Sequence, residues 1–339
     1  MNLITKKIKR RLKRWKKNVL SKFQQERQPS SALVHLFEAY NTGTNPPKVL
    51  LLGDSVAERV SWNDYDDRTL AELVINNLKG KTDVAAISYG GFTLDVFYHL
   101  MLALEKMKHK PRLVVLPINM RNFSPQWDLE PSWQFESEIQ QIKRFISDPS
   151  LIPSIEPVRR ETIPSEVFNA FDATPVEFAM SPFDRIAQFR LLVNASPATE
   201  EQRRFRLRQI FIFHYTNRLV RRHRKLTALE NILKLLQEKQ IPFLAYVTPL
   251  NVDAGVRLVG AEFLTALHEN VNMVSSLVGE NLTNRHSIFM DWSEAMRSDC
   301  FFHADNATEH LNESGRKLLA ESIAGEVSAW VDKSIHGEV

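Results

Sequence analysis

Lys48–Ser55 reads KVLLLGDS, a short apolar run that ends in Gly53-Asp54-Ser55. Continuous apolar residues are typical of a strand that is buried on both faces in a parallel sheet. Similar runs follow at Asp83–Ser88, Arg112–Ile118, Pro242–Thr248 and Ser287–Asp291. Helical patterns separate most of them, at 67–78, 94–108, 226–239 and 261–278. The alternation predicts an α/β fold with a parallel sheet, whose functional residues follow the C-terminal ends of the strands.

The composition excludes several classes of protein. A chain of 339 residues with 43% hydrophobic and 25% charged residues has room for a large core without disulfides or metals. Cys300 is the single cysteine, so an intrachain disulfide framework and zinc sites built on several cysteines are excluded. No uncharged apolar run reaches the ~18 residues of a membrane-spanning helix. Because we recognise no export signal, we expect the protein to be located in the reducing cytoplasm.

The net charge of +4 conceals two opposite regions. Residues 1–27 contain eleven Lys and Arg and one acid, a charge of +10. The other 312 residues contain 33 basic and 39 acidic side chains, a charge of −6. A basic arm therefore precedes a mildly acidic body, and the two need separate explanations.

The basic arm has a narrow apolar stripe. Its apolar residues are Ile4, Ile8, Leu12, Trp15, Val19 and Phe23. On a helix they fit within an arc of roughly 100°, with most of the Lys and Arg outside it. This pattern favours a helix on an anionic membrane surface, which would place the protein peripherally at the inner face of the membrane. The alternatives are a charged helix or tail without a partner and, less favoured, nucleic-acid binding.

Three further regions follow the arm. Residues 28–46 have the composition of a linker with a short helix, and residues 47–335 form the predicted α/β domain. Between the third and fourth strands, about residues 124–225 show no clear strand and many prolines, which predicts a mainly helical insertion. The basic residues at its end are Arg218, Arg221, Arg222, Arg224 and Lys225. We expect them to form a solvated helix face, with a second anionic contact surface as the alternative.

Ser55 and His310 are candidates for a nucleophile and its base. Ser55 follows the first strand directly, where the backbone turns and Gly53 permits an unusual conformation. A serine nucleophile needs a base, and the base needs an orienting acceptor. His310 stands in a polar loop just before an amphipathic helix near the C-terminus. At the catalytic edge of the sheet, such a histidine would reach a serine at a strand end.

Taken together, the sequence resembles the SGNH, or GDSL-type, hydrolase superfamily over roughly residues 47–335. Four blocks carry the resemblance, in the family's order: Gly53-Asp54-Ser55, Gly91-Phe92-Thr93, Leu116-Pro117-Ile118-Asn119 and His310-Leu311-Asn312-Glu313-Ser314-Gly315. The resemblance implies a three-layer, flavodoxin-like parallel sheet and a serine-dependent ester hydrolase. A hydrolase of this kind is expected to need no cofactor and no metal.

The resemblance also assigns roles to single residues. Ser55 would attack the acyl carbonyl while His310 takes its proton. The backbone N–H groups of Ser55 and Gly91 and the side-chain amide of Asn119 would form the oxyanion hole. Asn122 competes with Asn119 for that role, and Asp54 would brace the turn.

The acid of the triad departs from the family's pattern. Ala307 occupies the position three residues before the histidine, where the family has an aspartate. Met120 follows Asn119 at a position where the family usually has a second aspartate. We favour Asp305 as the acid, followed by Glu309 and then Asp291 at a strand end. Glu309 is disfavoured because adjacent side chains on an extended segment point apart.

These patterns lead to one preferred function and two alternatives. We expect a deacylase resembling acetylesterases, which acts through an acyl-serine on a small-molecule or carbohydrate ester. An O-acyltransferase would use the same site with a different acceptor. A non-catalytic membrane-surface scaffold on a decayed hydrolase fold would explain the missing acid and the basic arm.

Overall fold

The architecture comes from a computed structural model, which describes residues 31–127, 135–151, 153, 163–282 and 286–335. Its centre is one sheet of β1 (Val49–Gly53), β2 (Val84–Ser88), β3 (Leu113–Ile118), β4 (Phe243–Val247) and β5 (Ile288–Asp291). All pairs are parallel and the strand order is β2-β1-β3-β4-β5. The predicted α/β fold with a flavodoxin-like sheet is therefore confirmed, and each strand lies where the apolar run placed it.

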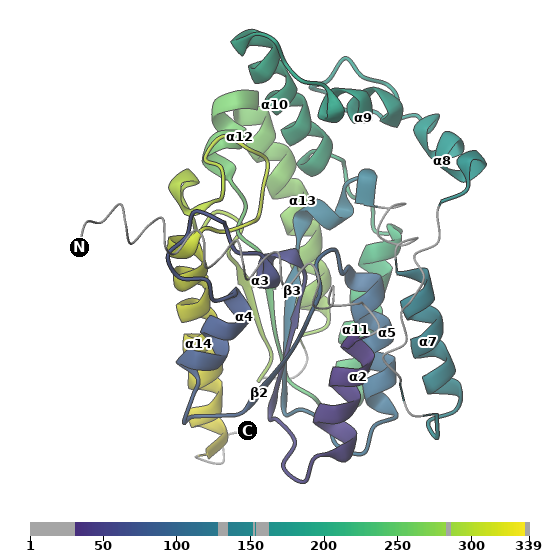
Figure 1. Ribbon diagram of the computed structural model, residues 1–339, viewed down its shortest axis with the longest axis vertical. Helices are drawn as coiled ribbons and strands as arrows, with labels where there is room; N and C mark the ends of the chain where they lie inside the picture. The colour runs from purple at the N-terminus through teal and green to yellow at the C-terminus, as the bar shows by residue number, and fades with distance from the viewer. Residues whose placement is uncertain (1–30, 128–134, 152, 154–162, 283–285, 336–339) are drawn as a thin grey trace.

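Helices cover both faces of the sheet (Figure 1). One face packs against α4 (Leu70–Asn77) and α14 (Glu313–Ile335), and the other against α5 (Leu94–Glu105), α11 (Arg224–Glu238) and α13 (Ala261–Glu280). Alternate residues of β1 enter opposite cores: Leu50 and Leu52 join the α5 side, while Val49 and Leu51 join the α14 side. A strand apolar on both faces thus produces the expected three layers.

The region between β3 and β4 is helical in its described residues. It contains α7 (Glu136–Ser147), α8 (Ser165–Asp172), α9 (Ile186–Asn194) and α10 (Glu200–Tyr215). Helix α7 packs against α5, whereas α8, α9 and α10 lie together at the top of Figure 1 with α12 (Val252–Val259). A separate small core that includes Phe178, Phe189 and Phe213 holds α9 against α10. The insertion therefore builds a helical cap beyond the sheet's C-terminal edge.

Two expectations from the sequence need correction: the linker at residues 28–46 and the solvated basic run 218–225. The short helix expected within residues 28–46 is present as α2 (Ser31–Phe37) and is followed by one π-helical turn (Glu38–Thr42). Leu36 and Tyr40 are fully buried in the main core. This segment is thus part of the domain and not a linker, because its apolar spacing gives it a core-facing side. Lys225 is also fully buried, so the basic run 218–225 is not wholly a solvated face.

The basic arm, residues 1–27, lies outside the described residues. Among the helices that the structure does describe, none is long and apolar enough to span a bilayer.

Candidate active site

Ser55 lies at the C-terminal end of β1, where it begins the short helix α3 (Ser55–Glu58). The preceding Asp54 caps this helix, because its Oδ1 accepts a hydrogen bond from the Val56 backbone N–H at 2.8 Å. The position of Gly53 requires a glycine because neighbouring side chains lie close to it. Its backbone angles are not the reason. A Cβ at this position would lie 2.4 Å from the Ala57 Cβ and 2.8 Å from the Ser88 Cβ. The Gly-Asp-Ser order is thus explained by a tight turn, a cap and an accessible hydroxyl.

Asn119 follows β3, the neighbour of β1, and links the two strand ends. Its Oδ1 accepts from the Arg121 N–H at 3.0 Å, which caps the 3₁₀ turn Met120–Phe123. Its Nδ2 donates to Asp54 Oδ2 at 2.8 Å. An amide NH₂ has two hydrogens, so one remains to donate toward a ligand. Burial raises the pKa of Asp54 to about 6, while the Val56 and Asn119 hydrogen bonds oppose that shift.

Gly91 follows β2 on the other side of β1. Its φ of +96° is in the left-handed region that glycine tolerates, and a Cβ there would be in contact with the Phe135 ring at 3.4 Å. The turn is anchored from α3, because Glu58 accepts from the Gly90 N–H at 2.8 Å and from the Ser88 hydroxyl at 3.3 Å. Glu58 therefore sets the position of the Gly91 backbone relative to Ser55.

His310 is positioned by the residues that start α14. Asn312 accepts hydrogen bonds from the Ser314 and Gly315 N–H groups and donates to the Asp299 and Phe301 carbonyls. The His-Leu-Asn-x-x-Gly spacing thus corresponds to a helix cap that also holds the preceding loop. In this arrangement His310 Nε2 lies 3.0 Å from Ser55 Oγ, within hydrogen-bond distance.

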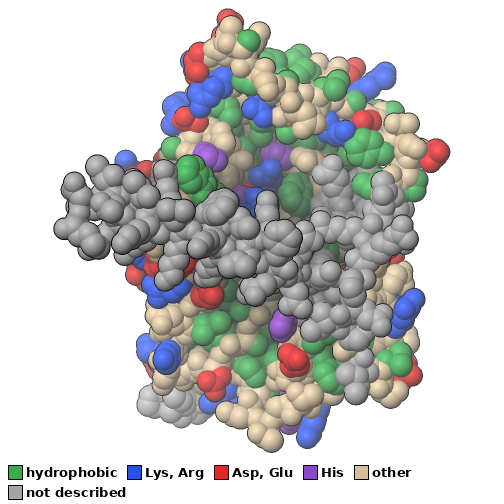
Figure 2. All heavy atoms as spheres, in the orientation of Figure 1, with side chains coloured by type: hydrophobic (Ala, Val, Ile, Leu, Met, Phe, Trp, Pro, Cys, Tyr) green, Lys and Arg blue, Asp and Glu red, His purple; other side chains and the backbone are tan. Residues whose placement is uncertain are grey.

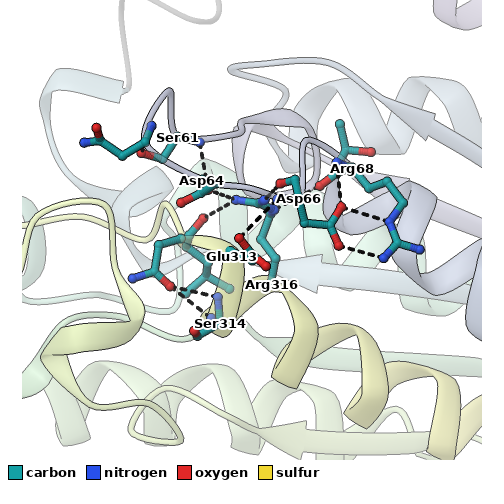
Figure 3. A network of polar contacts seen from close by, with 12 residues as sticks. Ser61, Asp64, Asp66, Arg68, Glu313, Ser314 and Arg316 are labelled. Carbon is teal, nitrogen blue, oxygen red and sulfur yellow. Dashed lines mark hydrogen bonds and ion pairs between the residues drawn. The ribbon is translucent and has the colours of Figure 1, made fainter. Parts of the chain in front are cut away.

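Arg316, near the start of α14, contacts the loop that contains Asp64, Asp66 and Arg68 (Figure 3). Its side chain is fully buried. It donates to the Leu311 carbonyl at 3.1 Å, the Arg68 carbonyl at 3.0 Å and the Asp66 carbonyl at 2.7 Å, and it pairs with Asp64 at 2.6 Å. The loop after α3 is therefore held to the loop that carries His310.

Ser55, Gly91, Asn119 and His310 share one cavity of about 250 Å³, which Asp305 and Asp291 do not line. It is lined by Asp54, Ser55, Arg59, Gly90, Gly91, Asn119, Arg121, Asn122, Trp127, Glu309 and His310. Figure 2 shows Lys or Arg and His side chains gathered in a hollow below the upper helices. A larger cavity of about 690 Å³ lies near the opposite ends of the strands, beside Arg112 and Pro242, and contains none of the four blocks.

No acid orients His310 among the residues that the structure describes. Nδ1 of its ring has no hydrogen-bond partner there, and Asp305 instead pairs with Arg257 at 2.7 Å and Arg203 at 3.5 Å. Burial and the nearby charges of Arg59 and Arg121 lower the pKa of His310 to about 3. The imidazole is therefore neutral near pH 7 and able to accept a proton, but an imidazolium there is poorly stabilised.

The two reserve acids are also engaged elsewhere. Glu309 accepts a short hydrogen bond from the Tyr215 hydroxyl and lies 3.5 Å from the Arg121 guanidinium. Asp291, at the end of β5, accepts from the Ser293 N–H at 2.9 Å. The structure brings together Ser55, Gly91, Asn119 and His310 but joins none of the three acids to the histidine.

Several lining residues were not singled out from the sequence. Arg59 is four residues after Ser55, and Arg121 is two residues after Asn119. Their closeness in sequence to these blocks could have indicated that they line the site. Trp127 lies within the expected insertion and offered none. No group of three or more His, Cys, Asp or Glu side chains in the described part of the chain is placed to hold a metal ion.

The comparisons with known proteins give only distant similarity. No family model and no curated protein matches the chain. A variant of Axe2, described as an acetyl-xylooligosaccharide esterase from Geobacillus stearothermophilus, is 12% identical with a TM-score of 0.41. Axe2 itself, an acetylxylan esterase, is 12% identical with a TM-score of 0.39; both alignments cover 83% of this chain and 94% of the other. Similarity at this level assigns no activity to the chain.

Proposed function

We propose that the protein is a serine-dependent carboxylic-ester hydrolase. The observation that carries the proposal is the 3.0 Å contact between His310 Nε2 and Ser55 Oγ, inside a cavity that Gly91 and Asn119 also line. A neutral imidazole beside a serine at a helix start is the arrangement that activates a hydroxyl for attack on a carbonyl. The order of the four sequence blocks supports the same family of hydrolases.

The chemistry uses two half-reactions. Ser55 Oγ attacks the ester carbonyl carbon while its proton moves to His310 Nε2. The resulting oxyanion accepts hydrogen bonds from the Asn119 amide and the backbone N–H groups of Ser55 and Gly91. The Ser55 N–H is the first of a helix and has no intrahelical partner. When the C–O bond breaks, His310 gives the proton to the alcohol, and water then hydrolyses the acyl-serine by the same steps reversed.

The substrate class belongs to the proposal as well. A cavity of about 250 Å³ accommodates a short acyl group and part of an alcohol, which fits a small acyl ester such as an acetylated carbohydrate. An O-acyltransferase would use the same acyl-serine with a sugar hydroxyl as acceptor. Among the described residues that line the cavity, no contact favours that acceptor over water.

One observation favours a non-catalytic protein as the second candidate. The imidazole of His310 lacks an acidic partner among the described residues, which weakens its orientation. A decayed hydrolase would keep the fold and lose turnover.

Ser55→Ala decides between the two candidates. The wild type is expected to hydrolyse p-nitrophenyl acetate and to be labelled by a serine-reactive phosphonate. Ser55→Ala is expected to lose both properties, whereas Ser322→Ala, an exposed serine on α14, retains them. Equal labelling and equal hydrolysis in wild type and Ser55→Ala would exclude the serine mechanism.

For residues 1–27 we propose peripheral binding to an anionic membrane surface at the cytoplasmic face. The support is the sequence pattern of a +10 segment with an apolar stripe. Flotation with anionic liposomes is expected to require residues 1–27. Equal flotation of the full chain and a chain without the arm would refute the proposal.

A further inference from the structure

Arg59 places a cation at the mouth of the Ser55 cavity. It is the residue after α3, four positions beyond Ser55, and its side chain is exposed and lines the cavity. Within the part of the chain that the structure describes, its guanidinium makes no hydrogen bond or ion pair. A guanidinium in this position has all of its donors available to a ligand.

Arg121 supplies a second cation to the same cavity and is held in place. Its guanidinium lies 3.3 Å from His214 Nε2, 3.5 Å from the Glu309 carboxylate and 5.8 Å from the centre of the Trp127 ring. Burial and the Arg121 charge keep the pKa of His214 well below its usual value, so this ring is a neutral acceptor. Because 22% of the Arg121 side chain is still accessible, the anchored residue also contributes to the cavity surface.

The acids of the cavity do not cancel these charges at the imidazole. Asp54 is buried against the Val56 N–H and the Asn119 amide, and Glu309 is engaged by Tyr215 and Arg121. The charged groups that act on His310 are the two arginines, and both disfavour its protonated form. Proton transfer from Ser55 to His310 places a third positive charge beside them, while the negative charge formed in the same step is on the oxyanion of the substrate.

We propose that Arg59, supported by Arg121, binds a carboxylate or phosphate group carried by the ester substrate. The proposal rests on the hydrolase function and narrows its substrate class to anionic esters. Guanidinium groups suit both anions because their donors match a pair of anionic oxygens. A bound anion would offset the positive potential at His310 and stabilise the imidazolium formed in the first step. The substrate thus supplies the negative charge that no acid places behind the histidine.

Matched esters test the proposal with full-length protein. 4-Acetoxybenzoate and its methyl ester differ in one negative charge, and their kcat/KM ratio is measured in wild type, Arg59→Gln and Arg112→Gln. Arg112 is the control because it is also exposed but precedes β3, at the sheet edge opposite Ser55. Arg59→Gln is expected to lower the anionic-to-neutral ratio about tenfold to a hundredfold, the usual effect of losing a charged hydrogen bond. Arg112→Gln is expected to keep the wild-type ratio.

A binding measurement separates this proposal from the hydrolase function. Calorimetric titration with 4-hydroxybenzoate and, separately, with inorganic phosphate compares wild type with the same two variants. Weaker binding of either anion in Arg59→Gln alone supports the site, and the stronger of the two anions identifies the preferred group. Hydrolysis of both esters with an unchanged ratio in Arg59→Gln would overturn the anion site and leave the hydrolase intact. Absence of hydrolysis of both esters would refute the hydrolase function. The anion site would be refuted separately if neither anion bound to the wild type, or if Arg59→Gln bound both anions as tightly as the wild type does.

Discussion

The side-chain amide of Asn119 donates to Asp54 Oδ2 over 2.8 Å and thereby joins the loops after β3 and β1. These two strands are neighbours in the sheet although α3, α4, β2 and α5 separate them in sequence. The contact lies at the point where the strand order reverses direction, the usual ligand position in open α/β sheets. It orients an amide hydrogen donor beside Ser55, and several of the expected properties depend on it.

Replacing Asn119 by alanine should reduce turnover more than binding. We expect kcat for p-nitrophenyl acetate to fall about 10²–10³-fold, because one donor to the oxyanion is lost. Asn122→Ala is the matched control, since Asn122 lines the same cavity but makes no side-chain contact with Asp54. A larger loss in Asn122→Ala than in Asn119→Ala would reverse the assignment of the oxyanion donor.

The acid that we favoured from the sequence should matter little for catalysis. Asp305 pairs with Arg257 and Arg203, and 52% of its side chain is exposed. We therefore expect Asp305→Asn to change kcat by less than about threefold, against the roughly 10⁴-fold cost of the same change in an intact triad. Steady-state kinetics on a neutral ester measure the difference. A loss of a hundredfold or more would show that Asp305 reaches His310 during turnover.

The geometry of the strands explains which site residues could be predicted. Parallel strands end at one edge, so Ser55, Gly91 and Asn119 were bound to lie near one another once their strands were recognised. The His310 block was recognisable because a cap at Asn312 and a close approach at Gly315 impose a fixed spacing.

The remaining parts of the site depend on loop conformation. The partners of Asp305, the position of Arg59 and the burial of Lys225 are set by contacts between segments far apart in the chain. Lys225 donates to the carbonyls of Asn122 and Trp127 and so holds the loop after β3. The nearby Arg222 and Arg224 are exposed, whereas Lys225 is on the core-facing side of α11 with Leu229 and Ile232. Its charge argued against burial at that position. Likewise, residues 31–42 resembled a linker because they are short and flanked by polar residues.

The pH profile of kcat/KM should lack the acidic limb that titration of an ordinary histidine produces. Because the pKa of His310 is lowered to about 3, its imidazole stays neutral as the pH falls from 8 to 5. Asp54 becomes protonated as the pH falls through about 6, which weakens its two hydrogen bonds and lowers kcat/KM for a neutral ester. The limb near pH 6 should therefore disappear in Asp54→Asn. Persistence of a limb near pH 6.5 in that variant would mean that His310 titrates normally.

Glu138 should make the fold less stable at alkaline pH. Its side chain is fully buried in α7, and within the described parts of the chain neither carboxylate oxygen has a hydrogen-bond partner of normal geometry. Burial raises its pKa from 4.5 to about 8, which the Leu33 backbone N–H only partly opposes. A raised folded-state pKa gives stability that is present below pH 4.5 and lost as the pH rises through 8. The loss amounts to at most about 5 kcal/mol.

Urea unfolding at pH 5 and pH 9 measures this dependence. Glu138→Gln should remove most of the decrease in the free energy of unfolding between the two values. Glu136→Gln is the control, because Glu136 is exposed in the first turn of the same helix. An unchanged decrease in Glu138→Gln would assign the pH dependence to other groups.

Removing the Arg316 side chain should loosen the link between the two halves of the site. The guanidinium is fully buried and pairs with Asp64 at 2.6 Å, so Arg316→Met removes this buried ion pair (Figure 3). We expect a loss of about 3–5 kcal/mol in the free energy of unfolding, measured with urea. Lys317→Met, which removes an exposed partner of Glu313, should cost less than about 1 kcal/mol. Because Arg316 also holds the Leu311 carbonyl next to His310, kcat should fall in protein that remains folded. A variant with wild-type kcat would show that the Asn312 cap alone positions the histidine.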